Sequence, residues 1–173
     1  RCPRQWNTEG GGNDERDFHD LPLWVPLAVA KYIENSGDLT IFDEKARWLD
    51  DESVASLAKH LDAGMRYVLV YGPNELLEIG AGDWNDALSG LGLKGESLWL
   101  NQFAYYALAK MKKFRDEYGI QFSTDIEGQM ERLYQGVIKG WNGKWFTRGY
   151  HENGTPVGGK DRIFLLPQAW FTI

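Results

Sequence analysis

The sequence predicts an all-α fold with short β-hairpin decoration. Two observations lead to this prediction: apolar residues recur with a helical period in several long segments, and the turn signals of short hairpins lie after residue 140. The 173 residues have the length of one domain, and 43% of them are apolar, which is enough to build a core. We therefore expect four or five antiparallel helices joined by loops rich in aromatic residues.

The first helix is predicted over residues 21–36. Asp20 is a natural N-cap, and Pro22 suits the first helical turn because its missing N–H needs no partner there. Gly37 is placed to end the helix. Pro26, one turn into the segment, marks either the true start of the helix or a kink.

The later elements follow from the same periodicity. Apolar stripes predict three more long helices, and a Pro-Gln pair opens a last short one. The expected ranges are a single turn within 38–49, helices over 51–71 and 96–118, a helix that Ser123 caps and Gly140 ends, and a segment that starts at Pro167. A tight turn at 141–145, a short strand at 145–150 and a turn at 152–154 form the predicted hairpin.

Composition and charge exclude several classes of protein. The 19 basic and 25 acidic residues give a net charge of −6 without a Lys/Arg-rich run, which argues against duplex nucleic acid or an anionic membrane as a partner. The longest apolar runs are shorter than the roughly 18 residues that a membrane-spanning helix needs. The single cysteine, Cys2, excludes an internal disulfide framework and gives no metal cluster, so we expect no metal site.

The aromatic content is high, with eight Trp, eight Tyr and eight Phe residues. Most aromatic side chains build cores and interfaces. Carbohydrate-handling proteins are also rich in them, because the apolar faces of sugar rings lie flat on indole. Composition alone leaves both interpretations open.

The segment 78–92 does not have the pattern of a scaffold element. Glycines surround Asp83, Trp84 and Asp86, and glycine lets the backbone bend tightly and approach a ligand closely. In one helical turn, the two aspartates would point the same way. An indole beside a carboxyl group favours its neutral form, which raises the pKa towards that of a useful general acid. The alternative is an ordinary capped turn, with Asp83 as the N-cap of a short helix over 84–88.

The stretch Gly80-Ala-Gly-Asp-Trp-Asn-Asp86, followed by Gly95-Glu-Ser-Leu-Trp-Leu100, resembles the catalytic segment of the glycoside hydrolase family 94 phosphorylases. This family includes the cellobiose, chitobiose and β-1,2-oligoglucan phosphorylases and the phosphorylase-like part of cyclic β-1,2-glucan synthases. Two stretches resemble the family's segment before the catalytic loop: Asp20-Leu-Pro-Leu-Trp-Val-Pro26 and Ala30-Lys-Tyr-Ile-Glu34. Three stretches resemble the segment after it: Arg148-Gly-Tyr150, Asn153-Gly-Thr155 and Ile163-Phe-Leu-Leu-Pro-Gln-Ala-Trp170. The resemblance thus extends in the family's order over nearly the whole chain.

The resemblance implies that the chain is part of an (α/α)6 barrel. It also implies phosphorolysis of a β-glucoside disaccharide or oligosaccharide, which is a glycosyl transfer to phosphate. Asp86, the second aspartate of the Trp-Asn-Asp triplet, matches the family's general acid. It would protonate the glycosidic oxygen while inorganic phosphate, the co-substrate, attacks the anomeric carbon with inversion. Phosphate is already an anionic nucleophile, so the reaction needs no second carboxylate to deprotonate water, and no cofactor is expected.

The same resemblance implies a set of substrate-binding residues near Asp86. Trp84 would form a wall of the −1 sugar subsite, unless it is a buried core indole. The other residues expected to contact sugar are Asp83, Asp20, Arg16, Arg148 and Gln168. Helix capping is the structural alternative for Asp20, and bonding at the start of a helix is the alternative for Gln168.

Two other functions remain open. An inverting hydrolase on the same barrel would need a second carboxylate across the cleft, for which Asp20 and Glu152 are the candidates. A non-catalytic fragment would bind glycan through its aromatic loops without turnover. Of the neighbouring polar residues, His19 is either a ligand or a satisfied structural histidine, and Glu96 is expected in the first turn of a helix rather than in catalysis.

Residues 1–173 are expected to form a partial catalytic domain. The resemblance implies whole enzymes several times longer, with a β-sandwich domain before the barrel, further helices on both sides, and phosphate-binding residues beyond the last motif matched here. An open half-barrel would expose apolar helix faces, which predicts homo-oligomerisation or poor solubility. Because phosphate is the co-substrate and no signal-peptide pattern is present, a cytoplasmic location is expected.

Overall fold

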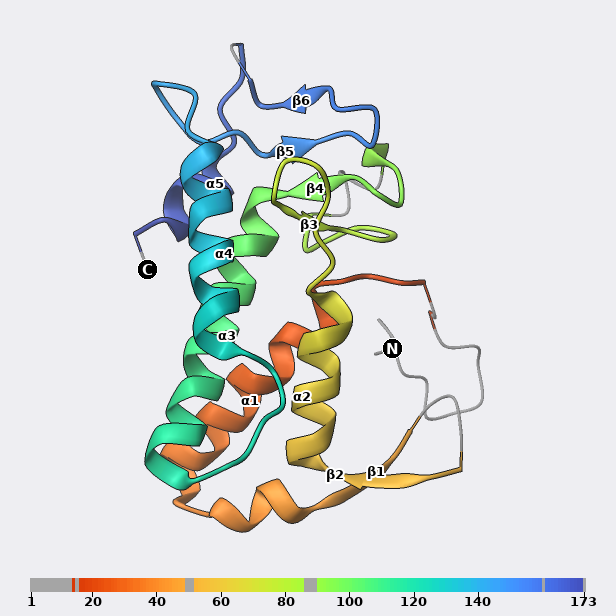
Figure 1. Cartoon of the computed structure of the whole chain (residues 1–173), viewed down its shortest axis with the longest axis vertical. Helices are drawn as coiled ribbons and strands as arrows, with labels where there is room; N and C mark the ends of the chain where they lie inside the picture. The colour runs from red at the N-terminus through yellow and green to blue at the C-terminus, as the bar shows by residue number, and fades with distance from the viewer. Residues whose placement is uncertain (1–13, 15, 49–51, 86–89, 160, 173) are drawn as a thin grey trace.

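The computed structural model describes residues 14, 16–48, 52–85, 90–159 and 161–172, and within these ranges the chain forms five α-helices (Figure 1). They are α1 (Leu21–Ser36), α2 (Leu57–Val68), α3 (Leu98–Tyr118), α4 (Ile126–Lys139) and α5 (Leu165–Trp170). A 3-10 helix, η1 (Leu39–Asp43), follows α1 and is the helical turn expected within 38–49. The prediction of helices with short β elements is confirmed, whereas closure of an (α/α)6 barrel stays a prediction.

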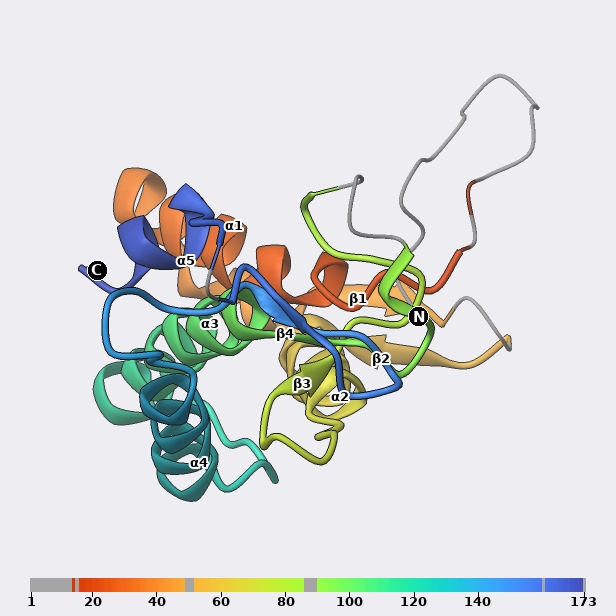
Figure 2. The ribbon, with the colours of Figure 1, turned by 90° about the horizontal axis from the view of Figure 1, so that it is seen from above.

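The strands are short and lie at opposite ends of the helices. β1 (Lys45–Arg47) and β2 (Val54–Ser56) form an antiparallel pair at the lower end in Figure 1. β3 (Leu77–Glu78), β4 (Glu96–Ser97), β5 (Gly149–Tyr150) and β6 (Pro156–Val157) form an antiparallel sheet in this order. Figure 2 shows this sheet across the ends of α2 and α3. It brings together three loops that are far apart in the sequence.

Helix α3 is the central element of the structure. It packs against α1, α4 and α5, and α1 packs in turn against α2. All residues from Leu98 to Ala104 are buried, so the first third of α3 is enclosed on almost every side. Further along, Met111 and Phe114 continue the same core. The amino-terminal end of α3, which enters from β4, therefore lies deep in the molecule and provides a rigid support for the loops above it.

The observed start of each helix depends on its partners. The predicted start of the second helix is wrong: α2 begins at Leu57 rather than at residue 51, because Val54–Ser56 pair with Lys45–Arg47 as strands. The third helix begins two residues later than predicted, since Glu96 and Ser97 belong to the four-stranded sheet. Helix α1 occupies the predicted range and continues through Pro26, and Gly37 ends it with a left-handed φ of 69°.

The connection between α3 and α4 is held by two aspartates. Ser123, the predicted cap of the fourth helix, does not cap it; its hydroxyl donates to Asp62 of α2 at 2.5 Å. The N-cap is Asp125, whose carboxylate accepts from the backbone N–H of Gly128 at 3.1 Å. Thr124 donates to Asp62 from both its backbone N–H and its hydroxyl. The Asp62 carboxylate thus fixes the loop that reverses the chain direction.

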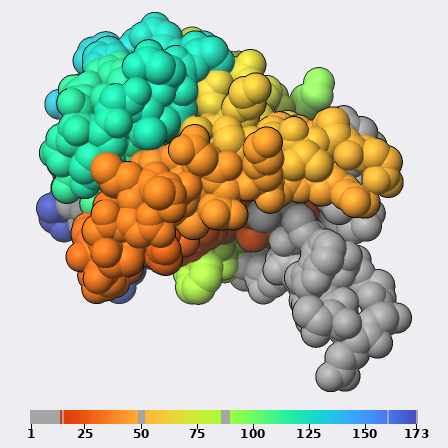
Figure 3. Space-filling view, turned by 90° about the horizontal axis from the view of Figure 1, so that it is seen from below, coloured from red at the N-terminus to blue at the C-terminus, as the bar shows by residue number. Residues whose placement is uncertain are grey.

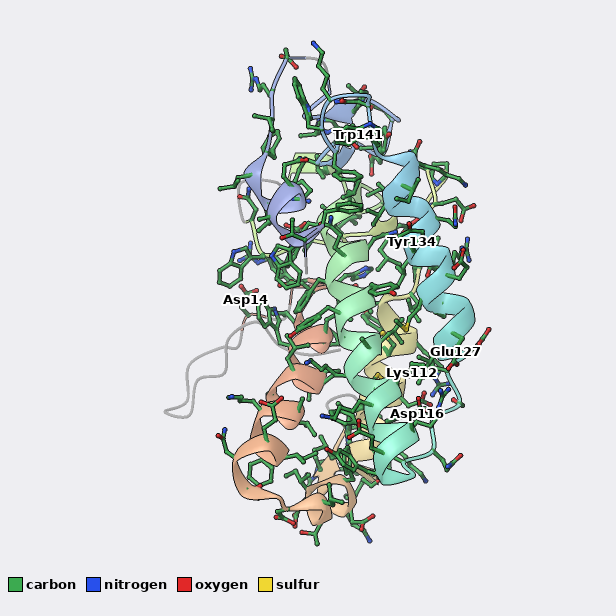
Figure 4. The ribbon with its side chains drawn as sticks, turned by 90° about the vertical axis from the view of Figure 1, so that its left-hand side faces the viewer. Asp14, Lys112, Asp116, Glu127, Tyr134 and Trp141 are labelled. Atoms are coloured by element: carbon green, nitrogen blue, oxygen red, sulfur yellow. The ribbon has the colours of Figure 1, made fainter. Side chains whose placement is uncertain are left out.

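One side of α4 remains open. Tyr134 and Ile138 of this helix are 46% and 39% exposed, so part of its apolar surface faces solvent. Figure 4 shows Tyr134 on α4 and Trp141 just beyond its end. Seen from below, α1 and the β1–β2 hairpin form one continuous face (Figure 3). Within the described ranges, no helix is both long enough and apolar enough to cross a bilayer.

Candidate active site

The segment before α1 lies directly against the glycine-rich loop that follows β3. Phe18 forms β-bridges with Gly80 and Gly82, and the Ala81 N–H donates to the Asp17 carbonyl at 2.6 Å. Gly80 has a φ of 59°, and a Cβ there would lie 2.3 Å from the Asp17 oxygen. Only glycine permits this approach without displacing one of the two segments. The residues just before the Asp20–Pro26 motif therefore pack against the Gly80–Asp86 motif.

His19 is a satisfied structural histidine. Its Nδ1 lies 2.6 Å from the Glu78 carbonyl oxygen, which can only accept, so Nδ1 carries the proton. Its Nε2 lies 3.5 Å from Asp17, and the Tyr67 hydroxyl donates to the same carboxylate at 2.7 Å. The ring is buried and packs edge-on against Tyr67. These contacts hold the segment before α1 in place.

Asp83 is buried in an ion pair. Its carboxylate accepts from the Arg148 guanidinium, with Nη2 2.7 Å from Oδ1, and from the Ser97 hydroxyl at 2.7 Å. Arg148 is fully buried, and Asp83 is 1% exposed. Oδ1 also accepts from the backbone N–H of Asn85 at 3.0 Å, which forms an Asx turn. In this structure, neither side chain is accessible from solvent, although both were expected to contact sugar.

Trp84 is 63% exposed and is therefore not a core indole. Its ring centroid lies 5.7 Å from that of Trp24, which is 37% exposed and packs in turn on buried Phe103 at 4.5 Å. The Trp24 indole N–H donates to Asp20 at 3.1 Å. Asp20 occupies the N-cap position of α1, as predicted, but its side chain makes no capping hydrogen bond. Trp24 and Trp84 thus form an exposed aromatic pair that is anchored to the core on one side.

Arg16 and Gln168 lie in different surroundings. The Arg16 side chain is 61% exposed, forms a bidentate pair with Asp14 and lies over the Phe18 ring at 5.2 Å. Gln168 bonds to backbone groups: its amide accepts from the Phe146 N–H and donates to the Phe146 carbonyl, as well as to the Phe164 carbonyl. It ties α5 to the segment that leads into Arg148. This is a structural set of bonds of the kind expected as the alternative for Gln168.

The two glutamates considered from the sequence also differ. Glu96 is buried and accepts from the backbone N–H groups of Asn74 and Leu76 at 2.9 and 3.2 Å, so it shapes the loop before β3. Glu152 is exposed, and its carboxylate lies against Gly92, where a Cβ would come within 2.3 Å of Oε2. Among the described residues, no group of three His, Cys, Asp or Glu side chains is arranged to hold a metal ion.

The predicted general acid, Asp86, lies outside the described residues. The described ranges end at Asn85 before it in the sequence and begin again at Gly90 after it. Sequence reasoning did not identify Ser97 or Trp24 as parts of the site. Both lie within the quoted motifs, but spacing along the chain does not show that Ser97 meets Asp83 or that Trp24 meets Trp84.

Comparison with known proteins agrees with the motifs. The model of the glycosyl hydrolase 94 superfamily catalytic domain matches residues 2–173. The chain belongs to this family. It is 29% identical to solabiose phosphorylase of Paenibacillus borealis over 98% of the chain and 23% of that protein. It is 26% identical to 3-O-beta-D-glucopyranosyl-beta-D-glucuronide phosphorylase of the same organism, over 87% of the chain and 21% of that protein.

A longer family member is also similar. The cyclic beta-(1,2)-glucan synthase NdvB of Rhizobium meliloti (strain 1021) is 27% identical over 89% of the chain but only 6% of its own length. The chain therefore spans less than a quarter of each of these relatives. Membership of the family and the phosphorylase character of its relatives confirm the resemblance found in the motifs.

Proposed function

We propose that the chain is part of an inverting glycoside phosphorylase in which Asp86 is the general acid. The observation that carries the proposal is the exposed indole of Trp84, two residues before Asp86 and paired with Trp24 beside Asp20. The two rings are tilted by 53°, and the exposed face of the Trp84 indole is a flat apolar surface of the kind on which a sugar ring stacks. The chain belongs to the glycosyl hydrolase 94 family, and its relatives include phosphorylases, which supports the same conclusion.

In the proposed reaction, a phosphate oxygen forms a bond to the anomeric carbon as the glycosidic C–O bond breaks. The leaving oxygen takes the proton of Asp86, which becomes a carboxylate and regains a proton from solvent before the next turnover. The products are a sugar 1-phosphate and the shortened sugar. Inversion follows because phosphate attacks the face opposite to the leaving group, and no metal or organic cofactor takes part.

The proposed substrate contacts fall into two groups. Trp84 and Arg16 are exposed, so we propose that they contact the disaccharide or oligosaccharide directly, whereas Asp20 accepts a hydrogen bond from the Trp24 indole. Asp83, Arg148 and Gln168 are engaged with other protein groups and would act on the sugar through the residues they hold. A homo-oligomeric state and a cytoplasmic location stay predictions.

Phosphate dependence in the full-length protein that carries this chain tests the proposal. We expect sugar 1-phosphate to form from a β-linked disaccharide only when phosphate is present. The variant Asp86→Asn should keep the fold and lower kcat at least ~10²-fold, the usual scale for the loss of a general acid. Asp161→Asn, at an exposed aspartate near α5, is the matched control and should keep full activity. Equal activity of Asp86→Asn and the control would refute the assignment.

A hydrolase is the second candidate, because Glu152 has an exposed carboxylate. The Glu152 backbone N–H donates to the Leu91 carbonyl, and its side chain lies against Gly92. This position lies beside the segment that resumes after Asp86. Free sugar released in phosphate-free buffer, and lost in Glu152→Gln, would favour hydrolysis. Glycan binding without turnover by either route, unchanged in Asp86→Asn, would favour a non-catalytic role.

A further inference from the structure

The Ser97 hydroxyl uses all of its hydrogen-bonding capacity. It donates to Asp83 Oδ2 at 2.7 Å, accepts from Arg148 Nη1 at 2.6 Å, and accepts from the Leu100 backbone N–H at 3.1 Å. A hydroxyl has one proton and two acceptor positions, so this arrangement is complete. The same side chain is the N-cap of α3.

Three elements meet at this hydroxyl. Asp83 belongs to the glycine-rich loop after β3, Ser97 ends β4, and Arg148 immediately precedes β5. The Leu98 N–H donates to the Arg148 carbonyl at 3.1 Å, which fixes the arginine backbone against the start of α3. The negative charge of Asp83 faces the amino-terminal end of this helix, where the helix dipole stabilises an anion.

The Asp83–Arg148 ion pair is almost fully shielded from solvent. Asp83 is 1% exposed, whereas Ser97 and Arg148 are completely buried. Removal of one partner of such a pair leaves the other charge without compensation in a medium of low polarity. The arginine Nε has no hydrogen-bond partner among the described residues, so the guanidinium depends on the bonds made by Nη1 and Nη2.

The Asp83–Arg148 ion pair also holds the backbone of the exposed loop that carries Trp84. Arg148 Nη2 bonds to Asp83 Oδ1, and the same oxygen accepts from the Asn85 backbone N–H at 3.0 Å. Trp84 lies between Asp83 and Asn85 in the sequence, and its side chain is 63% exposed to solvent. The backbone that carries the indole is therefore held on both sides by one carboxylate, immediately before the chain reaches Asp86.

We propose that Arg148 is a positioning residue, which acts through Asp83 and Ser97 to fix the direction of Trp84 and of the chain leading into Asp86. The effect on turnover rests on the proposed phosphorylase function, whereas the effect on Trp84 does not. Arg148 does not touch the sugar, because its side chain is enclosed by protein. Misplacement of a loop by about 1 Å can cost on the order of 10²-fold in rate, so the restraint bears directly on catalysis.

The test uses three variants of the full-length protein. Arg148→Met removes the charge, Arg148→Lys keeps the charge but loses the fork of donors, and Ser97→Ala removes one link while keeping the ion pair. The readouts are kcat, KM and the ¹⁹F resonance of Trp84 after labelling with 5-fluorotryptophan, assigned by comparison with Trp84→Phe. Asp62→Asn is the matched control, because it disrupts a buried, hydrogen-bonded carboxylate that holds a different loop.

We expect Arg148→Met to lower kcat ~10²-fold and to shift or broaden the Trp84 resonance, with Arg148→Lys and Ser97→Ala intermediate in both. Asp62→Asn should lower thermal stability while leaving kcat and the Trp84 resonance of the folded protein unchanged. An unmoved Trp84 resonance in Arg148→Lys and Ser97→Ala overturns the proposal, even where Arg148→Met fails to fold. A raised KM with an unmoved resonance would instead indicate direct sugar contact. Activity retained in Asp86→Asn would refute the proposed function alone, since the resonance still reports on Arg148.

Discussion

The indole of Trp24 lies with its ring centroid 5.7 Å from that of Trp84, although the first belongs to α1 and the second to the loop after β3. Trp24 is the inner member, because it also packs on Phe103 of the central helix. Trp84 is the outer member and the more exposed of the two. This order predicts that the two residues contribute differently to stability and to sugar binding.

Trp84→Ala is expected to weaken binding of a disaccharide by about 10-fold, because the stacking surface is lost while little buried area changes. The free energy of unfolding should stay within about 0.5 kcal/mol of the wild type. Trp141→Ala is the control, since Trp141 is 49% exposed but lies beyond the end of α4 (Figure 4). Isothermal titration calorimetry and chemical denaturation measure the two quantities. Equal binding losses in both variants would remove Trp84 from the sugar site.

Gly80→Ala is expected to destabilise the protein by more than about 2 kcal/mol, because it adds backbone strain and forces the glycine-rich loop away from Asp17. A Cβ at this position would lie 2.3 Å from a backbone oxygen. Gly37 has a similar φ of 69° but open space around it, so Gly37→Ala should cost only about 1 kcal/mol. Denaturant unfolding curves measure the difference. A loss in Gly80→Ala no larger than that in Gly37→Ala would mean that the contact relaxes freely.

Asp62 is expected to make stability depend on pH in the acid range. Burial raises the pKa of this carboxyl, but hydrogen bonds from Ser123 and Thr124 outweigh it, so the pKa is lowered overall. A carboxyl whose pKa is lower in the folded state stabilises the fold above its unfolded pKa of about 3.9, and this contribution is lost as the pH falls through the folded pKa.

Asp62→Asn should therefore cost about 1–3 kcal/mol at pH 7, with the difference from wild type shrinking below about pH 4. Thermal unfolding followed over a pH series measures this difference. A difference in stability between wild type and Asp62→Asn that stays constant down to pH 2 would contradict the assignment.

Glu127, at the start of α4, is expected to titrate near pH 2. Hydrogen bonds from Arg115 of α3 are the main cause, and they lower the pKa of the carboxyl to about 2. Figure 4 shows Glu127 beside Lys112 and Asp116, where the end of α3 meets α4. Arg115→Gln should raise the Glu127 pKa towards about 4.3, the ordinary value. Carboxyl chemical shifts followed by NMR during acid titration provide the measurement. A midpoint near 4 in the wild type would show that the pair does not persist in solution.

Local patterns predicted the helices well where a helix is bounded by its own residues. Helix α1 has the predicted ends because Pro22 favours its first turn and Gly37 terminates it with a left-handed φ. The start of α2 could not be predicted in this way. Val54–Ser56 continue the apolar spacing of the helix, yet they form a strand because Lys45–Arg47 lie alongside to accept the pairing.

The sequence by itself determined the helical character, the family and the motif that contains Asp83, Trp84 and Asp86. These follow from spacing and from residue types in a fixed order, which the chain carries before it folds. Only the tertiary structure decided that Asp83 faces Arg148 in a buried pair and that Trp84 stays exposed beside Trp24. The reason is physical: helical periodicity is a property of neighbouring residues, whereas the burial of a charge depends on which distant side chain packing brings to it.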